Sequence, residues 1–162
     1  MNRALALTVL LGGCAPASND PVDVPMLDLA AFRCSVQPVL AKRCAFLACH
    51  GSALRPLRVY APNRLRLGGE PTERDRPPSD VELEANYDRA RALATGGPEE
   101  ALLVRKPLDV TAGGLFHRGQ EMFGGDDVFV SRDDPGYRLL VAWIEDEEHP
   151  PDDCVPTDEV GP

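Results

Sequence analysis

Five cysteines limit what this 162-residue chain can fold into more than any other feature of its sequence. They are Cys14, Cys34, Cys44, Cys49 and Cys154. The first follows an apolar stretch near the N-terminus, and the other four are spread over the rest of the chain. Whether those four act as thiols, disulfides or ligands depends on the compartment in which the chain folds, because thiols seldom stay reduced outside the cytoplasm.

The N-terminus has the order of groups that is typical of a secretory signal. Arg3 precedes an apolar run over residues 4–11, and small residues then lead to Cys14. The tetrapeptide Leu11-Gly12-Gly13-Cys14 resembles the lipobox of bacterial lipoproteins, in which the chain is cut before the cysteine and the thiol is lipidated. We therefore interpret residues 1–13 as a signal peptide and Cys14 as the lipid attachment site. The alternative is an ordinary signal peptide with a coincidental cysteine.

The mature chain is expected to consist of a tether, one domain and a tail. Residues 14–30 are rich in proline and polar residues, which predicts a flexible tether. The domain is predicted to cover 31–146, and an acidic, proline-rich tail covers 147–162 and would be tied back by Cys154. A lipid on such a tether holds the domain in the cell envelope, on the periplasmic side or facing the outer membrane. The formal net charge of −9 argues against nucleic acid as a partner.

Hydrophobic periodicity and capping signals predict three helices. Apolar residues at helical spacing predict a helix from Ser35 to Cys44, with its single proline in the first turn. The capping-box signature Ser79-Asp80-Val81-Glu82 predicts the start of a second helix, which ends at Gly96-Gly97. Asp134-Pro135 predicts the N-cap and first position of a third, which continues with an apolar stripe.

The composition predicts long loops between these helices. The chain holds 16 prolines and 14 glycines, and only 6% of its residues are aromatic. Residues 51–78 are basic and aperiodic, which predicts a loop with one short strand at Leu57–Tyr60. The expected fold class is thus a small, mostly α-helical domain with long loops.

The segment from Cys44 to His50 contains the residues with the clearest chemical potential. It reads Cys44-Ala45-Phe46-Leu47-Ala48-Cys49-His50. This looks like a c-type haem site, in which two thiols add to the haem vinyl groups and the histidine after the second cysteine becomes the proximal iron ligand. Four residues separate the cysteines here instead of the usual two. Five helical positions advance about 7.5 Å and turn roughly 140°, so both thiols can meet one haem only across a bulge or loop.

The wider sequence resembles the single-haem, cytochrome c-like bacterial lipoproteins of planctomycete and myxobacterial type. The resemblance covers about half of the mature chain, in segments that comprise Val36 to Gly51, Leu102 to Leu108, the stretch with Gly113-Gly114, His117 and Phe123, and Asp133 to Ile144. It implies a cytochrome c-like fold with one covalent haem c, whose iron has His50 as proximal ligand. His117 is the distal ligand that the resemblance implies, and Met122 is the alternative. A second histidine gives a lower reduction potential than a methionine.

The function that this resemblance implies is one-electron transfer by a membrane-anchored carrier with a redox partner protein. Catalysis is not expected, since both axial positions of the iron are filled and the sequence has no nucleophile elbow, phosphate loop or zinc-protease helix. If Cys44 and Cys49 bind haem, Cys34 and Cys154 are left to form one disulfide.

Two other uses of the same residues stay open at this point. In the first, Cys44 pairs with Cys49 and Cys34 with Cys154, which gives a disulfide-stapled surface lipoprotein without a cofactor and with a non-enzymatic binding or structural role. In the second, a closed zinc or copper site forms from two thiolates and two imidazoles, those of Cys44, Cys49, His50 and His117.

Overall fold

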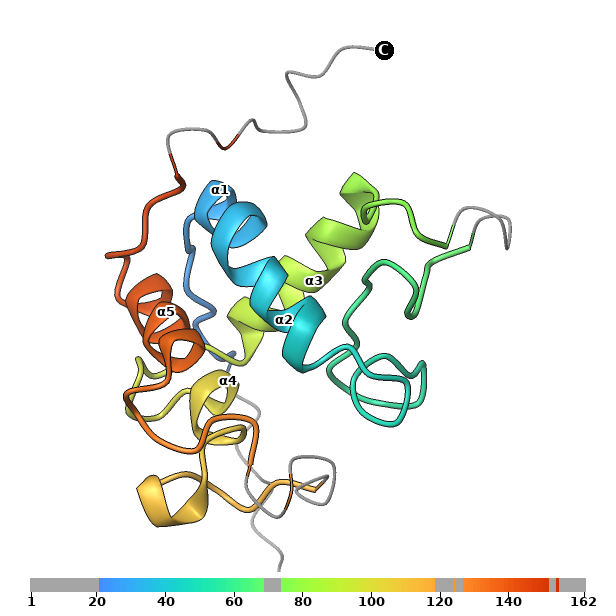
Figure 1. Cartoon of the computed structure of the whole chain (residues 1–162). Helices are drawn as coiled ribbons and strands as arrows, with labels where there is room; N and C mark the ends of the chain where they lie inside the picture. Colours follow the sequence, from blue (N-terminus) through green and yellow to red (C-terminus); the bar gives the residue numbers. More distant parts are fainter. Residues whose placement is uncertain (1–20, 69–73, 119–123, 125–126, 152–153, 155–162) are drawn as a thin grey trace, which may run out of the picture.

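The computed structural model describes residues 21–68, 74–118, 124, 127–151 and 154. Its helices lie together on one side, and the chain between α2 and α3 forms a long loop on the other (Figure 1). Within these residues there is no β-sheet, only the isolated bridges Tyr60–Leu65 and Leu108–Phe129. The prediction of a small, mostly helical domain with long loops is confirmed. No helix in the described ranges is long and apolar enough to span a membrane.

The first helical stretch is longer than predicted. It consists of α1 (Leu29–Ala31), the π-helical turn η1 (Phe32–Val36) and α2 (Gln37–Arg43), in unbroken succession. The side chain of Asp28 caps it by accepting the N–H of Ala31 at 2.8 Å, so the stretch begins before the predicted start at Ser35. Pro38 therefore lies within the stretch rather than in its first turn. It is the second residue of α2, just after the π-helical turn, where the usual hydrogen-bond ladder is already displaced and the missing N–H of proline costs little.

The other two predicted helices are present and start where predicted, but the first of them ends at Ala92, before the predicted end at Gly96-Gly97. The helical elements after the long loop are α3 (Asp80–Ala92), α4 (Leu102–Arg105), the short 3₁₀ turn η3 (Val110–Ala112) and α5 (Pro135–Ile144). Both hydrogen bonds of the capping box between Ser79 and Glu82 are present at the start of α3. At the start of α5, the Asp134 carboxylate accepts the N–H of Gly136 at 2.8 Å. Local capping signals therefore located these two helices correctly.

Three aromatic side chains from different elements form the centre of the core. The ring of Phe32 lies 5.5 Å from that of Tyr87 and 5.4 Å from that of Trp143, measured between centroids. Their polar atoms bind the chain before α1: the Tyr87 hydroxyl donates to the Leu27 carbonyl at 2.6 Å, and the Trp143 indole N–H to the Asp28 carbonyl at 2.9 Å. The last residues of the expected tether are therefore packed on the domain.

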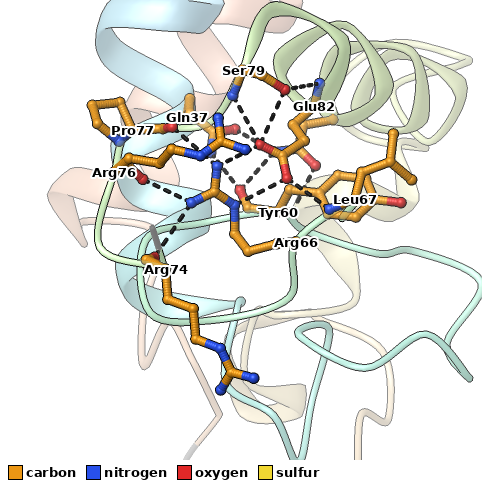
Figure 2. Close-up of polar contacts among 10 residues, drawn as sticks. Gln37, Tyr60, Arg66, Leu67, Arg74, Arg76, Pro77, Ser79 and Glu82 are labelled. Atoms are coloured by element: carbon orange, nitrogen blue, oxygen red, sulfur yellow. Dashed lines mark hydrogen bonds and ion pairs between the residues drawn. The ribbon is translucent and has the colours of Figure 1, made fainter. Parts of the chain in front are cut away.

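A buried ion pair fastens the long loop to α3 (Figure 2). The side chain of Glu82 is 1% exposed and accepts hydrogen bonds from Arg66 at 2.7 Å and from the N–H of Leu67 at 2.7 Å. The same guanidinium donates to the carbonyls of Arg76 and Pro77 at 2.9 and 3.1 Å. Arg66 and Glu82 thus join two parts of the loop to one another and to the helix.

Amide side chains hold the loop one helical turn further along α3 (Figure 2). The Asn86 carboxamide accepts the N–H of Tyr60 and donates to its carbonyl, both at 2.9 Å. Gln37 on α2 donates to the same carbonyl at 3.0 Å. The predicted strand at Leu57–Tyr60 is therefore wrong, because side-chain amides rather than a neighbouring strand satisfy the backbone groups of Tyr60.

One disulfide joins the start of the domain to the tail. Cys34 in η1 is bonded to Cys154, with a Cα–Cα distance of 6.1 Å and a sequence separation of 120. The predicted pairing of these two cysteines is confirmed. Because the bond closes most of the chain into one loop, it restricts the unfolded state strongly.

We expect the paired substitution Cys34→Ser and Cys154→Ser to lower the free energy of unfolding by about 4–5 kcal/mol, from the lost restriction of the unfolded chain. Urea denaturation without reductant, followed by tryptophan fluorescence, measures this. Reductant should lower the free energy of unfolding of the wild type to that of the variant, and should leave that of the variant unchanged. Equal stability of the two proteins without reductant would contradict the prediction.

We expect Glu82→Gln to lower the free energy of unfolding by about 3–5 kcal/mol, because it removes the negative charge that is hydrogen-bonded to the buried Arg66 guanidinium. Although burial by itself would raise the pKa of Glu82, the hydrogen bonds and charge of Arg66 and the N–H groups of Leu67 and Ser79 hold this pKa at about 2, below the ordinary 4.5. The stabilisation is thus complete above pH 4.5 and lost as the pH falls toward 2.

The matched control is Glu84→Gln, an exposed position on the same helix. Denaturation curves at several pH values should show a large Glu82→Gln defect at pH 7 that shrinks below pH 4.5, and a small, pH-independent effect of Glu84→Gln. A Glu82→Gln defect that stays constant down to pH 2 would refute the ionic origin.

Candidate functional site

The chain reverses direction tightly after α2 and brings His50 back to Cys44. The N–H of His50 donates to the Cys44 carbonyl at 3.1 Å, and that of Gly51 donates to the Phe46 carbonyl at 2.9 Å. A Cβ atom on Gly51 would overlap the carbonyl group of Ala45, so only glycine fits this return. The residues between the two cysteines therefore form a loop rather than a further helical turn, as the long spacing requires.

Neither cysteine of this turn is part of a disulfide. Cys44 and Cys49 are not bonded to each other. The structure therefore differs from the alternative with two disulfides that was considered from the sequence. Cys44 is 8% exposed. Its burial, and to a smaller extent the neighbouring Cys49, raises the pKa of the Cys44 thiol to about 12, against the opposing charge of Arg43.

His117 is held by backbone contacts of the segment that follows η3. A Cβ atom on Gly114 would overlap the carbonyl group of Leu108, so this glycine permits the segment around residue 114 to pass close to the backbone at Leu108. The N–H of Leu115 then donates to the carbonyl of Arg105 at 2.8 Å. These contacts fix the path of the chain just before His117.

The structure brings His50 and His117 together. Their ring centroids are 6.0 Å apart, and the ring planes differ by 11°. Metal–imidazole bonds are about 2 Å long, so two rings on opposite sides of one metal ion have centroids roughly 6 Å apart once the ring radii are added. The separation also suits an offset aromatic pair. The hydrogen bonds of the two rings bear on whether they are a pair of metal ligands or an aromatic pair.

Both histidines use Nδ1 for a hydrogen bond to an acceptor. His50 Nδ1 lies 2.9 Å from the Leu57 carbonyl, and His117 Nδ1 lies 3.0 Å from the Asp127 carboxylate. Since these oxygens accept, each Nδ1 carries the proton, and Nε2 of a neutral ring keeps its lone pair. Burial lowers the pKa of His50, as do the charges of His117 and Arg55, whereas the bond to Leu57 opposes the shift. A neutral ring with a free Nε2 is the form that binds metals.

Two cavities lie against the histidine pair, and Cys49, His50 and His117 line both. The first, of about 350 Å³, also contacts Cys44 and is otherwise lined mainly by apolar side chains, among them Leu40, Leu57, Leu93, Leu103, Val128 and Leu140. The second, of about 390 Å³, is lined by the cationic side chains of Arg55, Lys106 and Arg118 together with Ala48, Pro56 and Phe116, and Lys106 and Arg118 also line the first. Each volume falls in the range of roughly 300–1,000 Å³ that is typical of small-molecule sites.

Sequence reasoning missed Asp127. Asp127 is only 2% exposed and lies within hydrogen-bond distance of His117. The apolar residues that follow, Val128 and Phe129, are a weak sign of burial in the sequence, and nothing there points to His117.

Several predicted site residues lie outside the described part of the chain. These are the lipidation site Cys14 and the alternative ligand Met122, and Phe123 of the segment that carries the family resemblance also lies there. Among the residues that are described, no three His, Cys, Asp or Glu side chains are arranged to hold a metal ion by themselves. Within the described residues, Cys44, Cys49, His50 and His117 are not grouped as the closed zinc or copper site considered from the sequence.

No family model, no curated protein and no solved structure matches this chain. The argument for a function therefore rests on the geometry of the site.

We expect Gly51→Ala to open the turn between Cys44 and His50, at a cost of about 1–3 kcal/mol for the overlap with the Ala45 carbonyl. Alkylation of the haem-free protein, followed by peptide mass spectrometry, measures the effect. Cys44 should react slowly in the wild type because it is buried, and faster in the variant. Ser52→Ala, at the next position, is the control and should leave Cys44 protected. Equal protection in Gly51→Ala would show that the turn tolerates a side chain.

Proposed function

We propose that this chain is an extracytoplasmic electron-transfer protein, anchored to a membrane by a lipid on Cys14 and carrying one covalently bound haem c. Its iron would be held by His50 and His117. The proposal extends to the cytochrome c-like character of the fold and to a redox partner protein. The paired histidines with free Nε2 atoms carry the argument.

Two side chains far apart in the sequence meet here in the form that iron requires. Their ring separation of 6.0 Å equals the value expected for two axial ligands of one ion. An aromatic pair alone would not require a hydrogen bond from Nδ1 of both rings. Metal-binding histidines, in contrast, regularly donate this N–H to an acceptor that orients the ring. His117 rather than Met122 is therefore the distal ligand in this proposal.

The two thiols support covalent attachment of the group. Cys44 and Cys49 are not disulfide-bonded in a chain that forms another disulfide, and both line the apolar cavity beside the histidines. The loop between them removes the main objection to the long spacing, because His50 returns to Cys44 instead of continuing a helix.

The two cavities match the two chemical sides of a haem. Apolar side chains line the space next to Cys44, which suits the hydrocarbon part of a porphyrin. Arg55, Lys106 and Arg118 line the other space and suit the carboxylates that a haem carries. A haem iron needs no larger set of protein ligands, because the porphyrin nitrogens supply the remaining bonds.

A haem in this site would supply one-electron chemistry, and the protein residues would set its conditions. His50 and His117 would occupy both axial positions, which favours electron transfer over binding of a substrate to the metal. The apolar lining excludes water and thereby limits reorganisation of solvent around the site. The proposed role is therefore that of an electron carrier.

The test is expression with a cytochrome c maturation system, followed by a pyridine haemochrome spectrum and intact mass. We expect a c-type band and the added mass of one haem in the wild type. Cys49→Ser should lose the double thioether linkage, and His50→Ala should lose the bis-histidine spectrum because the proximal ligand is gone.

Matched controls are Cys34→Ser combined with Cys154→Ser, which removes cysteines outside the site, and His149→Ala in the tail. Both should keep the band and the mass. A wild type without haem after maturation, with Cys44 and Cys49 oxidised to a disulfide, would contradict the proposal. It would favour instead a disulfide-stapled surface lipoprotein with a binding or structural role.

A further inference from the structure

Asp127 is a buried carboxylate whose contacts are concentrated on one oxygen. Its side chain is 1% exposed. Oδ1 accepts the N–H of Val128 at 2.7 Å and lies 3.0 Å from Nδ1 of His117. Oδ2 is buried and has no hydrogen-bond partner among the residues that the structure describes.

Such an arrangement is costly for a purely structural residue. A buried carboxylate normally satisfies both oxygens or pairs with a cation. The partner here is a histidine whose ring is also placed to bind a metal, so a cation on the far side of the ring would supply the missing counter-charge. Where a carboxylate, a histidine and a metal ion are in line, the carboxylate orients the ring and raises its basicity.

The two histidines differ in this respect. His50 donates its Nδ1–H to a neutral backbone carbonyl, that of Leu57, at 2.9 Å. His117 donates to a carboxylate at 3.0 Å. A charged acceptor forms the stronger hydrogen bond and shifts more electron density onto Nε2.

We infer that Asp127 is a positioning residue for His117, which it holds in the Nδ1–H form and makes the more electron-rich of two unequal axial ligands. This inference rests on the proposed haem. A more electron-rich ligand stabilises ferric over ferrous iron and thereby lowers the reduction potential.

The decisive variant is Asp127→Asn, because the amide oxygen can still accept the N–H groups of His117 and Val128 while the negative charge is lost. Asp133→Asn is the control, since it removes one charge from an exposed position in the same part of the chain. Both variants are made as the matured full-length chain. Haem content, the visible spectrum and the midpoint potential are then compared with the wild type.

We expect Asp127→Asn to keep its haem and its bis-histidine spectrum, and to lose at least tenfold of the preference for ferric iron, in line with the effect of other metal-ligand partners. For a one-electron couple this is a rise of about 59 mV in midpoint potential. Asp133→Asn should stay at the wild-type value. A residue that only supports the fold would change stability and leave the potential where it was, so equal potentials in the two variants would overturn the inference.

The tautomer of His117 gives a second readout that does not need haem. In the haem-free protein, ¹⁵N NMR of the histidine side chains should show His117 protonated on Nδ1 in the wild type and shifted toward Nε2 in Asp127→Ala. A wild-type ring protonated on Nε2 would overturn the inference even if haem is bound. A wild type could also take up no haem and still show the Nδ1–H form of His117. That result would overturn the proposed function and the effect of Asp127 on an iron ligand, and would leave only the hydrogen bond between Asp127 and His117.

Discussion

The position of the longest loop depends on two buried polar side chains of α3, Glu82 and Asn86. A segment without strands has to find partners for its backbone groups elsewhere, because unpaired N–H and C=O groups are costly to bury. Asn86 binds both backbone groups of Tyr60. The adjacent residue, Val59, donates its N–H to the His50 carbonyl at 2.8 Å. The position of His50 therefore depends, through Val59 and Tyr60, on side chains of one face of α3.

The other histidine is placed from the opposite side of the cavities. His117 follows α4 and η3, and its partner Asp127 precedes the turn that leads into α5. Arg43, the last residue of α2, joins this turn to the cysteine segment: its guanidinium donates to the Val128 carbonyl at 3.0 Å and to the Asp134 carboxylate at 3.1 Å. The two parts of the site thus share one anchoring residue. Such a link would help to hold both histidines in place in the haem site proposed above.

Features that depend on neighbouring residues were predictable from the sequence. The capping box at Ser79 and the Asp134-Pro135 start were located correctly because a cap is formed within a few residues. The start of the first helical stretch was predicted too late. Proline-rich composition before it indicated a tether, and the contacts that order this part come from Tyr87 and Trp143, which are distant in the sequence.

The sequence by itself determined the chemistry that is available: two thiols and a histidine in a fixed order, a second histidine far downstream, and two further cysteines. It also determined the caps of α3 and α5. Only the tertiary structure decided that His50 and His117 face one space, that no disulfide joins Cys44 to Cys49, and that Asp127 is buried against His117. The reason is physical: caps arise from interactions between near neighbours in the chain, whereas the site depends on packing between distant segments.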